Sequence, residues 1–232
     1  MYKEKITLKN DLTGELHYKN PSSHLLVICH GYKSSPTHPG IVATTRGLNK
    51  RGHATFTFHF SGTNPLDLEP QVRDIHIIAK HFTSYNSITL IGASFGALSS
   101  AVASTSAHIR GLITVNGFFG SSKLGRQLYS TFATFQLLRI VHPKYRNVWK
   151  FFQRSFQPSQ IKVPTLVIHS VIDDTVLINQ SRSFYRQLTG LKQFAELEAA
   201  DHGLTLPGNT EEVVAIIDEW LHAVVVPKQV NT

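Results

Sequence analysis

One segment of the sequence combines a nucleophilic residue with a pattern that could activate it. It holds Gly-x-Ser-x-Gly at residues 92–96, between an apolar run at 88–91 typical of a short buried strand and an Ala- and Ser-rich segment at 97–107 typical of a closely packed helix. A sharp strand-to-helix turn holds Ser94 at its tip in a strained backbone conformation and needs glycine on either side. The helix N-terminus would stabilise negative charge there. The pattern predicts a nucleophilic serine, and a Ser/Gly turn without chemistry is the alternative.

The elements that must position this serine alternate along the chain. Residues 5–9 and 15–19 flank a turn at 11–14 and predict an antiparallel hairpin at a sheet edge. Further strands and helices follow in alternation, with strands expected at 25–29, 54–60, 88–91, 111–115, 164–169 and 193–197, and helices at 39–51, 68–85, 97–107, 178–188 and 211–224. This alternation predicts an α/β fold with a mostly parallel sheet covered by helices on both faces. Ligands of such sheets bind outside the carboxyl ends of the strands.

Four motifs fall at these expected strand ends. Besides the serine motif they are His30-Gly31-Tyr32, Asp173 within residues 169–176, and His202 in an Asp-His-Gly sequence. Together they resemble the α/β-hydrolase superfamily, and within it the small single-domain esterases of the feruloyl-esterase, monoacylglycerol-lipase and serine-aminopeptidase-like group. The resemblance covers about residues 25–221, and the order nucleophile, acid, base along the chain is the one that this superfamily predicts.

The resemblance implies a role for each motif. Ser94 is the expected nucleophile, and His202 is the base that removes its proton, because imidazole titrates near neutral pH. Asp173 would hold the imidazole in one tautomer and stabilise the imidazolium. The backbone N–H groups of Phe95 and Tyr32 are the implied oxyanion-hole donors.

Neighbouring residues offer alternatives to some of these assignments. Asp174 could replace Asp173 as the acid. We favour Asp173 because His-x-x-x-Asp-x-x-Val is the spacing of the superfamily, although Ser170 stands where that motif usually has glycine. Asp201 is interpreted as a turn or cap residue, and His30 as a structural partner of the oxyanion loop rather than a base.

Composition favours a single domain, covering residues 1–232. The chain is 41% hydrophobic and 16% charged, which suffices for one substantial core. The single cysteine, Cys29, excludes an internal disulfide. The N-terminus does not resemble a signal peptide, and no run approaches the roughly 20 apolar residues that span a bilayer, so a cytoplasmic protein is expected.

The net charge of +8 is distributed unevenly. Every charged residue between Asp74 and Asp173 is a lysine or an arginine. Because there is no zinc-finger spacing, RNA-binding signature or uninterrupted basic run, we do not expect nucleic acid as a partner. An anionic or lipid-like substrate, or contact with a membrane surface, explains the charge better. No metal-ligand spacing and no phosphate-binding glycine loop is present, so no metal or cofactor is expected.

Residues 117–157 form an insertion that mixes aromatic and basic residues and is predicted to be a small helical cap. Four aromatic residues in it are candidate substrate contacts: Phe118, Phe119, Tyr129 and Phe132. Alternatively, the aromatic residues form the core of the cap itself and the cations its solvated face. A cap of this size would enclose a limited pocket, which favours small to medium acyl groups.

Taken together, the sequence predicts a serine hydrolase that cleaves carboxylic esters of small to medium acyl or aryl groups through an acyl-enzyme. A peptidase or amidase, or a thioesterase or lysophospholipase, could use the same residues. A non-catalytic binding protein on this fold is the alternative from another class.

Overall fold

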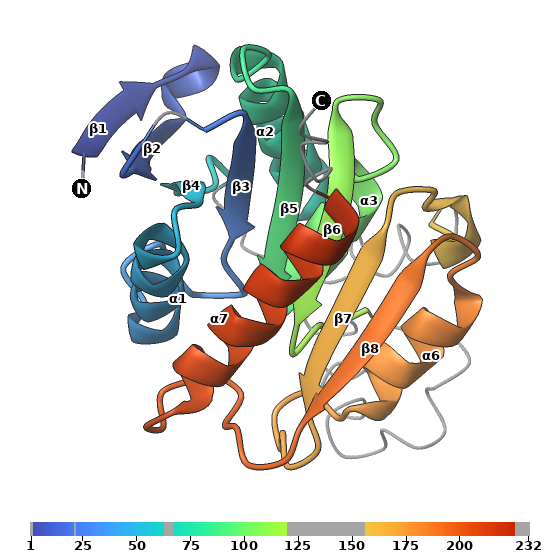
Figure 1. Ribbon diagram of the computed structural model, residues 1–232. Helices are drawn as coiled ribbons and strands as arrows, with labels where there is room; N and C mark the ends of the chain where they lie inside the picture. Colours follow the sequence, from blue (N-terminus) through green and yellow to red (C-terminus); the bar gives the residue numbers. More distant parts are fainter. Residues whose placement is uncertain (1, 21, 63–66, 120–155, 226–232) are drawn as a thin grey trace, which may run out of the picture.

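Runs of β-branched, leucine and aromatic residues form the strands of one eight-stranded sheet (Figure 1). The computed structural model describes residues 2–20, 22–62, 67–119 and 156–225. The strands, in chain order, are β1 (Tyr2–Thr7), β2 (Thr13–Tyr18), β3 (His24–Cys29), β4 (Ala54–Phe58), β5 (Ser87–Ala93), β6 (Ile109–Val115), β7 (Thr165–Ser170) and β8 (Lys192–Leu197). Their order across the sheet is β1-β2-β4-β3-β5-β6-β7-β8.

The sheet is mostly parallel, as the sequence predicts. Strands β4, β3, β5, β6, β7 and β8 run parallel, whereas β2 is antiparallel to both β1 and β4. The N-terminal hairpin therefore lies at a sheet edge, although its strands begin two to three residues earlier than expected. Because the other six strands are parallel, their carboxyl ends meet at one edge of the sheet.

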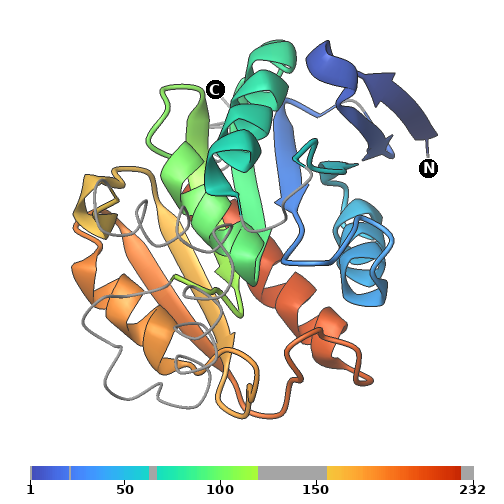
Figure 2. The same ribbon diagram turned by 180° about the vertical axis from the view of Figure 1, so that it is seen from behind.

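Helices cover both faces of this sheet. They are α1 (Pro39–Lys50), α2 (Leu68–His81), α3 (Phe95–Ala103), α6 (Asn179–Gln187) and α7 (Asn209–Trp220), which continues into a π-helical turn, η4 (Leu221–Val225). Helices α1 and α7 lie on the face toward the viewer in Figure 1, and α2, α3 and α6 lie on the opposite face, which Figure 2 shows from behind. Two short 3-10 turns, η1 (Lys9–Asp11) and η3 (Pro158–Gln160), join neighbouring elements.

Each face of the sheet has its own hydrophobic core. Leu26, Ile28 and Ile113 pack with residues of α1 and α7, among them Trp220, on one side. On the other side, the second large core includes Val27 and the fully buried Ile75 of α2. In the described part of the chain, no helix has the length and apolar character needed to cross a membrane. Most of the expected cap, residues 120–155, lies outside the described residues.

Candidate active site

Ser94 lies at the turn between β5 and α3 in a conformation that few side-chain-bearing residues adopt. Its φ of 52° and ψ of −120° place it among the described non-glycine residues with positive φ. A Cβ on Gly92 would lie 2.4 Å from the Gly96 carbonyl oxygen, and one on Gly96 would lie 2.3 Å from the Cys29 carbonyl oxygen. Both glycines are therefore needed because backbone passes too close for any side chain. The strained serine and the small neighbours expected from the sequence are both present.

Three side chains far apart in the sequence meet beside this turn. The Oγ of Ser94 lies 3.0 Å from Nε2 of His202, and Nδ1 of His202 lies 2.7 Å from Oδ2 of Asp173. Ser94 follows β5, Asp173 follows β7, and His202 lies in the loop between β8 and α7. The parallel sheet thus brings all three to the same edge.

Hydrogen bonding fixes the charge of Asp173. Its side chain is fully buried, and burial alone would raise its pKa. Hydrogen bonds from His169, from His202 and from the backbone N–H of Val176 outweigh burial and hold the pKa of Asp173 well below its usual value. An ionised carboxylate only accepts hydrogen bonds, so Nδ1 of His202 carries the proton and its Nε2 is free to accept the Ser94 hydroxyl proton.

His169 is a second imidazole beside the same carboxylate oxygen. Its Nε2 lies 2.7 Å from the Val176 carbonyl oxygen and 3.4 Å from Oδ2 of Asp173, so this nitrogen carries the proton and donates. The hydroxyl of Ser181 lies 2.7 Å from its Nδ1 and donates to it when the ring is neutral. Two imidazoles thus face one carboxylate, and only His202 reaches the serine among the described contacts.

The neighbouring acids have other places. Asp174 is exposed, and its carboxylate accepts a hydrogen bond from the Thr175 hydroxyl at 3.2 Å. Asp201 accepts hydrogen bonds from the backbone N–H groups of Thr205 and Leu206, at 2.7 and 3.0 Å. It therefore closes the turn after His202, which is the turn role that the sequence suggests.

Asn116, which no sequence motif singled out, connects the aspartate and histidine loops. Its side-chain oxygen accepts from the backbone N–H of Ser170 at 2.9 Å, and its amide nitrogen donates to the carbonyl of His202 at 3.0 Å. Its φ of 47° lies in the left-handed region, which asparagine tolerates better than most residues, but the sequence alone gives no signal for this role. The hydroxyl of Ser170 donates to the Ala200 carbonyl at 2.6 Å. The serine that stands where the superfamily motif usually has glycine therefore adds a hydrogen bond between β7 and the His202 loop.

The two expected oxyanion donors lie at neighbouring turns. Helix α3 begins at Phe95, so the N–H of that residue has no partner within the helix. The second turn, at Gly31, approaches so closely that a Cβ on Gly31 would lie 2.9 Å from the Cβ of Ser94. Within the described part of the chain, neither the Phe95 nor the Tyr32 N–H donates to another backbone carbonyl outside its own element.

His30 fixes the orientation of the Tyr32 amide. Its Nδ1 donates to the Gly31 carbonyl at 3.0 Å, and the Ser34 N–H donates to the same oxygen at 3.2 Å. Because the peptide unit is planar, holding the Gly31 carbonyl also fixes the direction of the Tyr32 N–H. Burial lowers the pKa of His30, which favours the neutral ring that makes this contact. His30 is thus placed as a structural partner of this loop.

The expected aromatic substrate contacts divide into three groups. Phe118 is half-buried, and its ring stacks on that of Phe95 with 6.0 Å between centroids, beside the serine turn. Phe119 corrects our expectation, because it is 7% exposed and stacks on Phe184 at 3.8 Å as part of the core. Tyr129 and Phe132 lie outside the described residues.

The described residues include one cluster with metal-ligand chemistry, away from the serine turn. His53, Asp218 and His222 each offer a ligand atom, all within 4.8 Å of one another. The carboxylate of Asp218 already accepts from His53 and from Arg51, both at 2.7 Å. Since these contacts satisfy the carboxylate, the cluster is accounted for as a link between α1 and α7.

Comparisons with known proteins agree with this architecture. Among solved structures, the chain is similar to Est1E from Butyrivibrio proteoclasticus, with 19% identity, 95% of this chain and 98% of that chain covered, and a TM-score of 0.76. The chain is also similar to the esterase domain of a Rhodothermus marinus protein, with 18% identity, 97% of this chain and 100% of that chain covered, and a TM-score of 0.74. A third similar structure is dienelactone hydrolase from Anabaena variabilis, with 17% identity, 96% of this chain and 97% of that chain covered, and a TM-score of 0.72. A search of curated proteins found no match.

The structural likenesses, at these identities, establish the α/β-hydrolase fold. A sequence match is more specific, since residues 70–226 fit the model of the prolyl oligopeptidase family. This match spans more than half of the chain and includes the serine turn, Asp173 and His202. The protein is therefore a hydrolase of the α/β-hydrolase superfamily that belongs to the prolyl oligopeptidase family.

Proposed function

We propose that this protein is a cofactor-independent serine hydrolase that cleaves carboxylic esters of small to medium acyl or aryl groups. The observation that carries the proposal is the continuous hydrogen-bonded series from Ser94 through His202 to Asp173. A serine hydroxyl is a poor nucleophile at neutral pH, and an oriented imidazole base raises its reactivity by about 10²- to 10⁴-fold.

The proposed reaction uses each group in turn. Ser94 Oγ attacks the ester carbonyl as its proton passes to Nε2 of His202, and Asp173 stabilises the resulting imidazolium. The N–H groups of Phe95 and Tyr32 hold the oxyanion of the tetrahedral intermediate, each contributing about 10²- to 10³-fold. His202 then protonates the departing alcohol. Water, deprotonated by the same imidazole, hydrolyses the acyl-enzyme.

The preference for esters rests on two supports. Two of the similar solved structures are named as an esterase domain and as Est1E, and a further one holds ferulic acid bound to Est1E. In this chain, the half-buried ring of Phe118 stacks on Phe95 next to the nucleophile, which offers an aromatic surface to an acyl or aryl group. An acyl-chain series of nitrophenyl esters is expected to peak below about twelve carbons.

Amide hydrolysis is the second candidate, because the matched family is named for an oligopeptidase. The same three side chains can protonate a departing amine. Nitroanilides of short peptides, assayed beside nitrophenyl esters of matched acyl groups, discriminate the two. A kcat/KM higher for the anilides would replace the ester proposal with a peptidase.

The experiment that tests the catalytic role is active-site labelling. A fluorophosphonate probe should label the wild-type protein, and Ser94→Ala should abolish labelling while the fold is retained. Ser106→Ala is the matched control, since Ser106 lies beyond the opposite end of α3. A folded wild-type protein that takes up no probe and hydrolyses no ester or amide would mean that this site only binds its ligand.

A further inference from the structure

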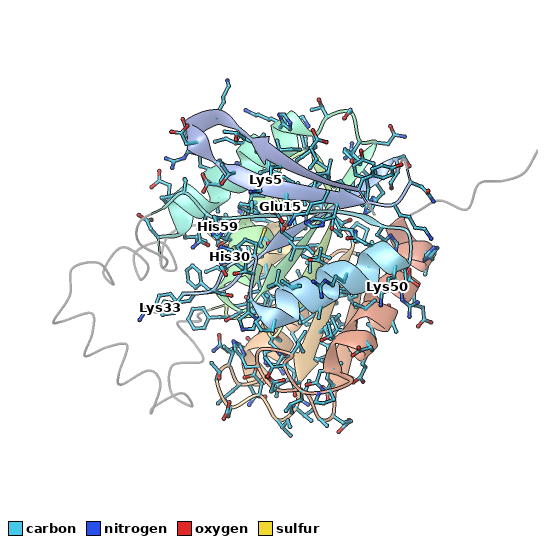
Figure 3. The ribbon with its side chains drawn as sticks, turned by 90° about the vertical axis from the view of Figure 1, so that its left-hand side faces the viewer. Lys5, Glu15, His30, Lys33, Lys50 and His59 are labelled. Atoms are coloured by element: carbon cyan, nitrogen blue, oxygen red, sulfur yellow. The ribbon has the colours of Figure 1, made fainter. Side chains whose placement is uncertain are left out.

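A hollow lies between the N-terminal hairpin and α1. It has a volume of about 610 Å³, within the range of small-molecule sites. We call it the hairpin groove and define it by the residues that the argument uses: Lys3, Lys5, Glu15, His17, Arg46 and His59. Figure 3 views this side of the molecule, with the hairpin above α1.

The floor of the groove follows from strand register. Lys3 pairs with His17 across β1 and β2, Lys5 pairs with Glu15, and Glu15 pairs with Thr57 of β4. Directly paired residues share a face, so these polar side chains lie on one side of the sheet. The alternate residues, among them Leu16 and Phe56, point into the core on the opposite side.

The wall of the groove comes from α1. Val42, Thr45 and Arg46 line it at the i, i+3, i+4 spacing of one helix face. Lys50, near the C-terminal end of the same helix, does not line the groove, and Figure 3 shows it at the far end of α1 from His59 and His30. The chain therefore supplies a matched exposed cation outside the groove.

The groove has an excess of positive charge. Glu15 is its one acidic side chain and is paired with Lys3 at 2.9 Å. Lys5 and Arg46 are exposed and form no ion pair with any residue that the structure describes. Two permanent cations thus face a hollow of ligand size, and carboxylate and phosphate groups are the partners that such cations favour.

One end of the groove lies close to the serine turn. His59, which follows β4, lines that end, and its ring centroid is 6.4 Å from that of His30. His30 precedes Gly31, which packs against Ser94. Figure 3 shows Lys5, Glu15, His59 and His30 in succession from the hairpin toward the loop that carries Lys33.

We propose that the hairpin groove binds the carboxylate or phosphate group of an anionic ester substrate whose ester bond is cleaved at Ser94. This inference rests on the proposed function. It narrows the substrate class from carboxylic esters in general to esters that carry a negative group at a distance from the bond to be cleaved. Lys5 and Arg46 are the residues that would bind the negative group of the substrate.

Binding can be measured without turnover. Glutarate and inorganic phosphate would be titrated calorimetrically, at low ionic strength, into full-length Ser94→Ala and into the same variant carrying Lys5→Glu and Arg46→Glu. Reversal of both charges should weaken the preferred anion at least about tenfold, and Lys50→Glu should leave its affinity within about twofold. The anion that binds more tightly, glutarate or phosphate, identifies the group that the hairpin groove prefers. Equal weakening by Lys50→Glu, or no binding of either anion, would overturn the groove.

Kinetics then tests the link to the ester bond. The ratio of kcat/KM for mono-4-nitrophenyl sebacate, whose carboxylate lies eight methylenes from the ester carbonyl, to that for 4-nitrophenyl decanoate should fall about tenfold in Lys5→Glu/Arg46→Glu, but not in Lys50→Glu. A ratio that the double variant leaves unchanged overturns the substrate role of the groove alone. If the wild-type protein hydrolyses neither ester and takes up no fluorophosphonate, the proposed function itself fails and the groove inference falls with it.

Discussion

Asp173 and Asp174 are neighbours of the same type in opposite environments. The first is buried against His202 and the second is exposed. We expect Asp173→Asn to lower kcat by about 10³- to 10⁴-fold with little change in KM, because an amide stabilises the wrong imidazole tautomer. Asp174→Asn, its matched control, should change kcat less than twofold. Steady-state kinetics on a nitrophenyl ester would check both variants. Equal losses of kcat would show that the assignment of Asp173 as the acid is wrong.

The same carboxylate makes stability depend on pH. The pKa of Asp173 is below its unfolded value of 3.8, so its contribution to folding is present above that value and is lost as the pH falls toward the folded pKa. Between about pH 5 and about pH 3, the urea midpoint of the wild type should fall more than that of Asp173→Asn. Parallel midpoints for the two proteins would contradict this assignment.

His30 should affect catalysis through the peptide that it orients. His30→Phe keeps the ring packed on Phe60, which lies 5.0 Å away, but removes the hydrogen bond to the Gly31 carbonyl. We expect kcat to fall about 10- to 100-fold, part of the value of one oxyanion donor, with KM nearly unchanged. His30→Asn, whose amide can replace Nδ1 as a donor, should recover part of the loss. A change confined to KM would argue against this positioning role.

At the scale of elements, the serine turn depends on close approach between α3 and the end of β3. A Cβ on Gly96 would lie 2.3 Å from the Cys29 carbonyl oxygen and 2.5 Å from that of His30. Gly96→Ala should therefore cost about 2 kcal/mol or more and displace Ser94, lowering both Tm and kcat. Gly190→Ala, whose Cβ would meet its nearest neighbour at an ordinary 3.4 Å, should change stability by less than about 0.5 kcal/mol. Similar Tm values for the two variants would refute the steric argument.

Local patterns predicted the elements better than they predicted the contacts between them. The alternation of apolar runs and turns located each described strand and helix, because periodicity follows from which face is buried. Element ends were less accurate, since α2 stops at His81 rather than at residue 85 and α3 starts at Phe95. The composition of the insertion predicts Phe119 as a pocket residue. It packs instead on Phe184 of α6, a contact that local sequence patterns do not show. Asn116 belongs to no motif, and only its tertiary hydrogen bonds reveal it.

At the scale of the molecule, one sheet supports two separate features, the loops at the carboxyl ends of its parallel strands and a polar surface on one face of its hairpin. The parallel strands carry the serine, aspartate and histidine loops, whereas the antiparallel hairpin extends the sheet past the face that α1 covers and leaves a polar floor. The fold family explains the first feature. The second arises from alternation in β1 and β2, which places lysines opposite Glu15 and His17 on the side away from the core.

The shared sheet also predicts how the protein unfolds. Both cores pack against the same strands, so neither helical layer can detach without exposing buried apolar surface. The single-domain prediction therefore implies one cooperative transition. In Trp149→Phe, the fluorescence of Trp220, which is 2% exposed at the C-terminal end of α7, and the far-UV ellipticity of the whole chain should give the same urea midpoint. If the Trp220 signal were complete before the ellipticity changed, the layer containing α7 would be a separate unit, and the division of the chain into one domain would be wrong.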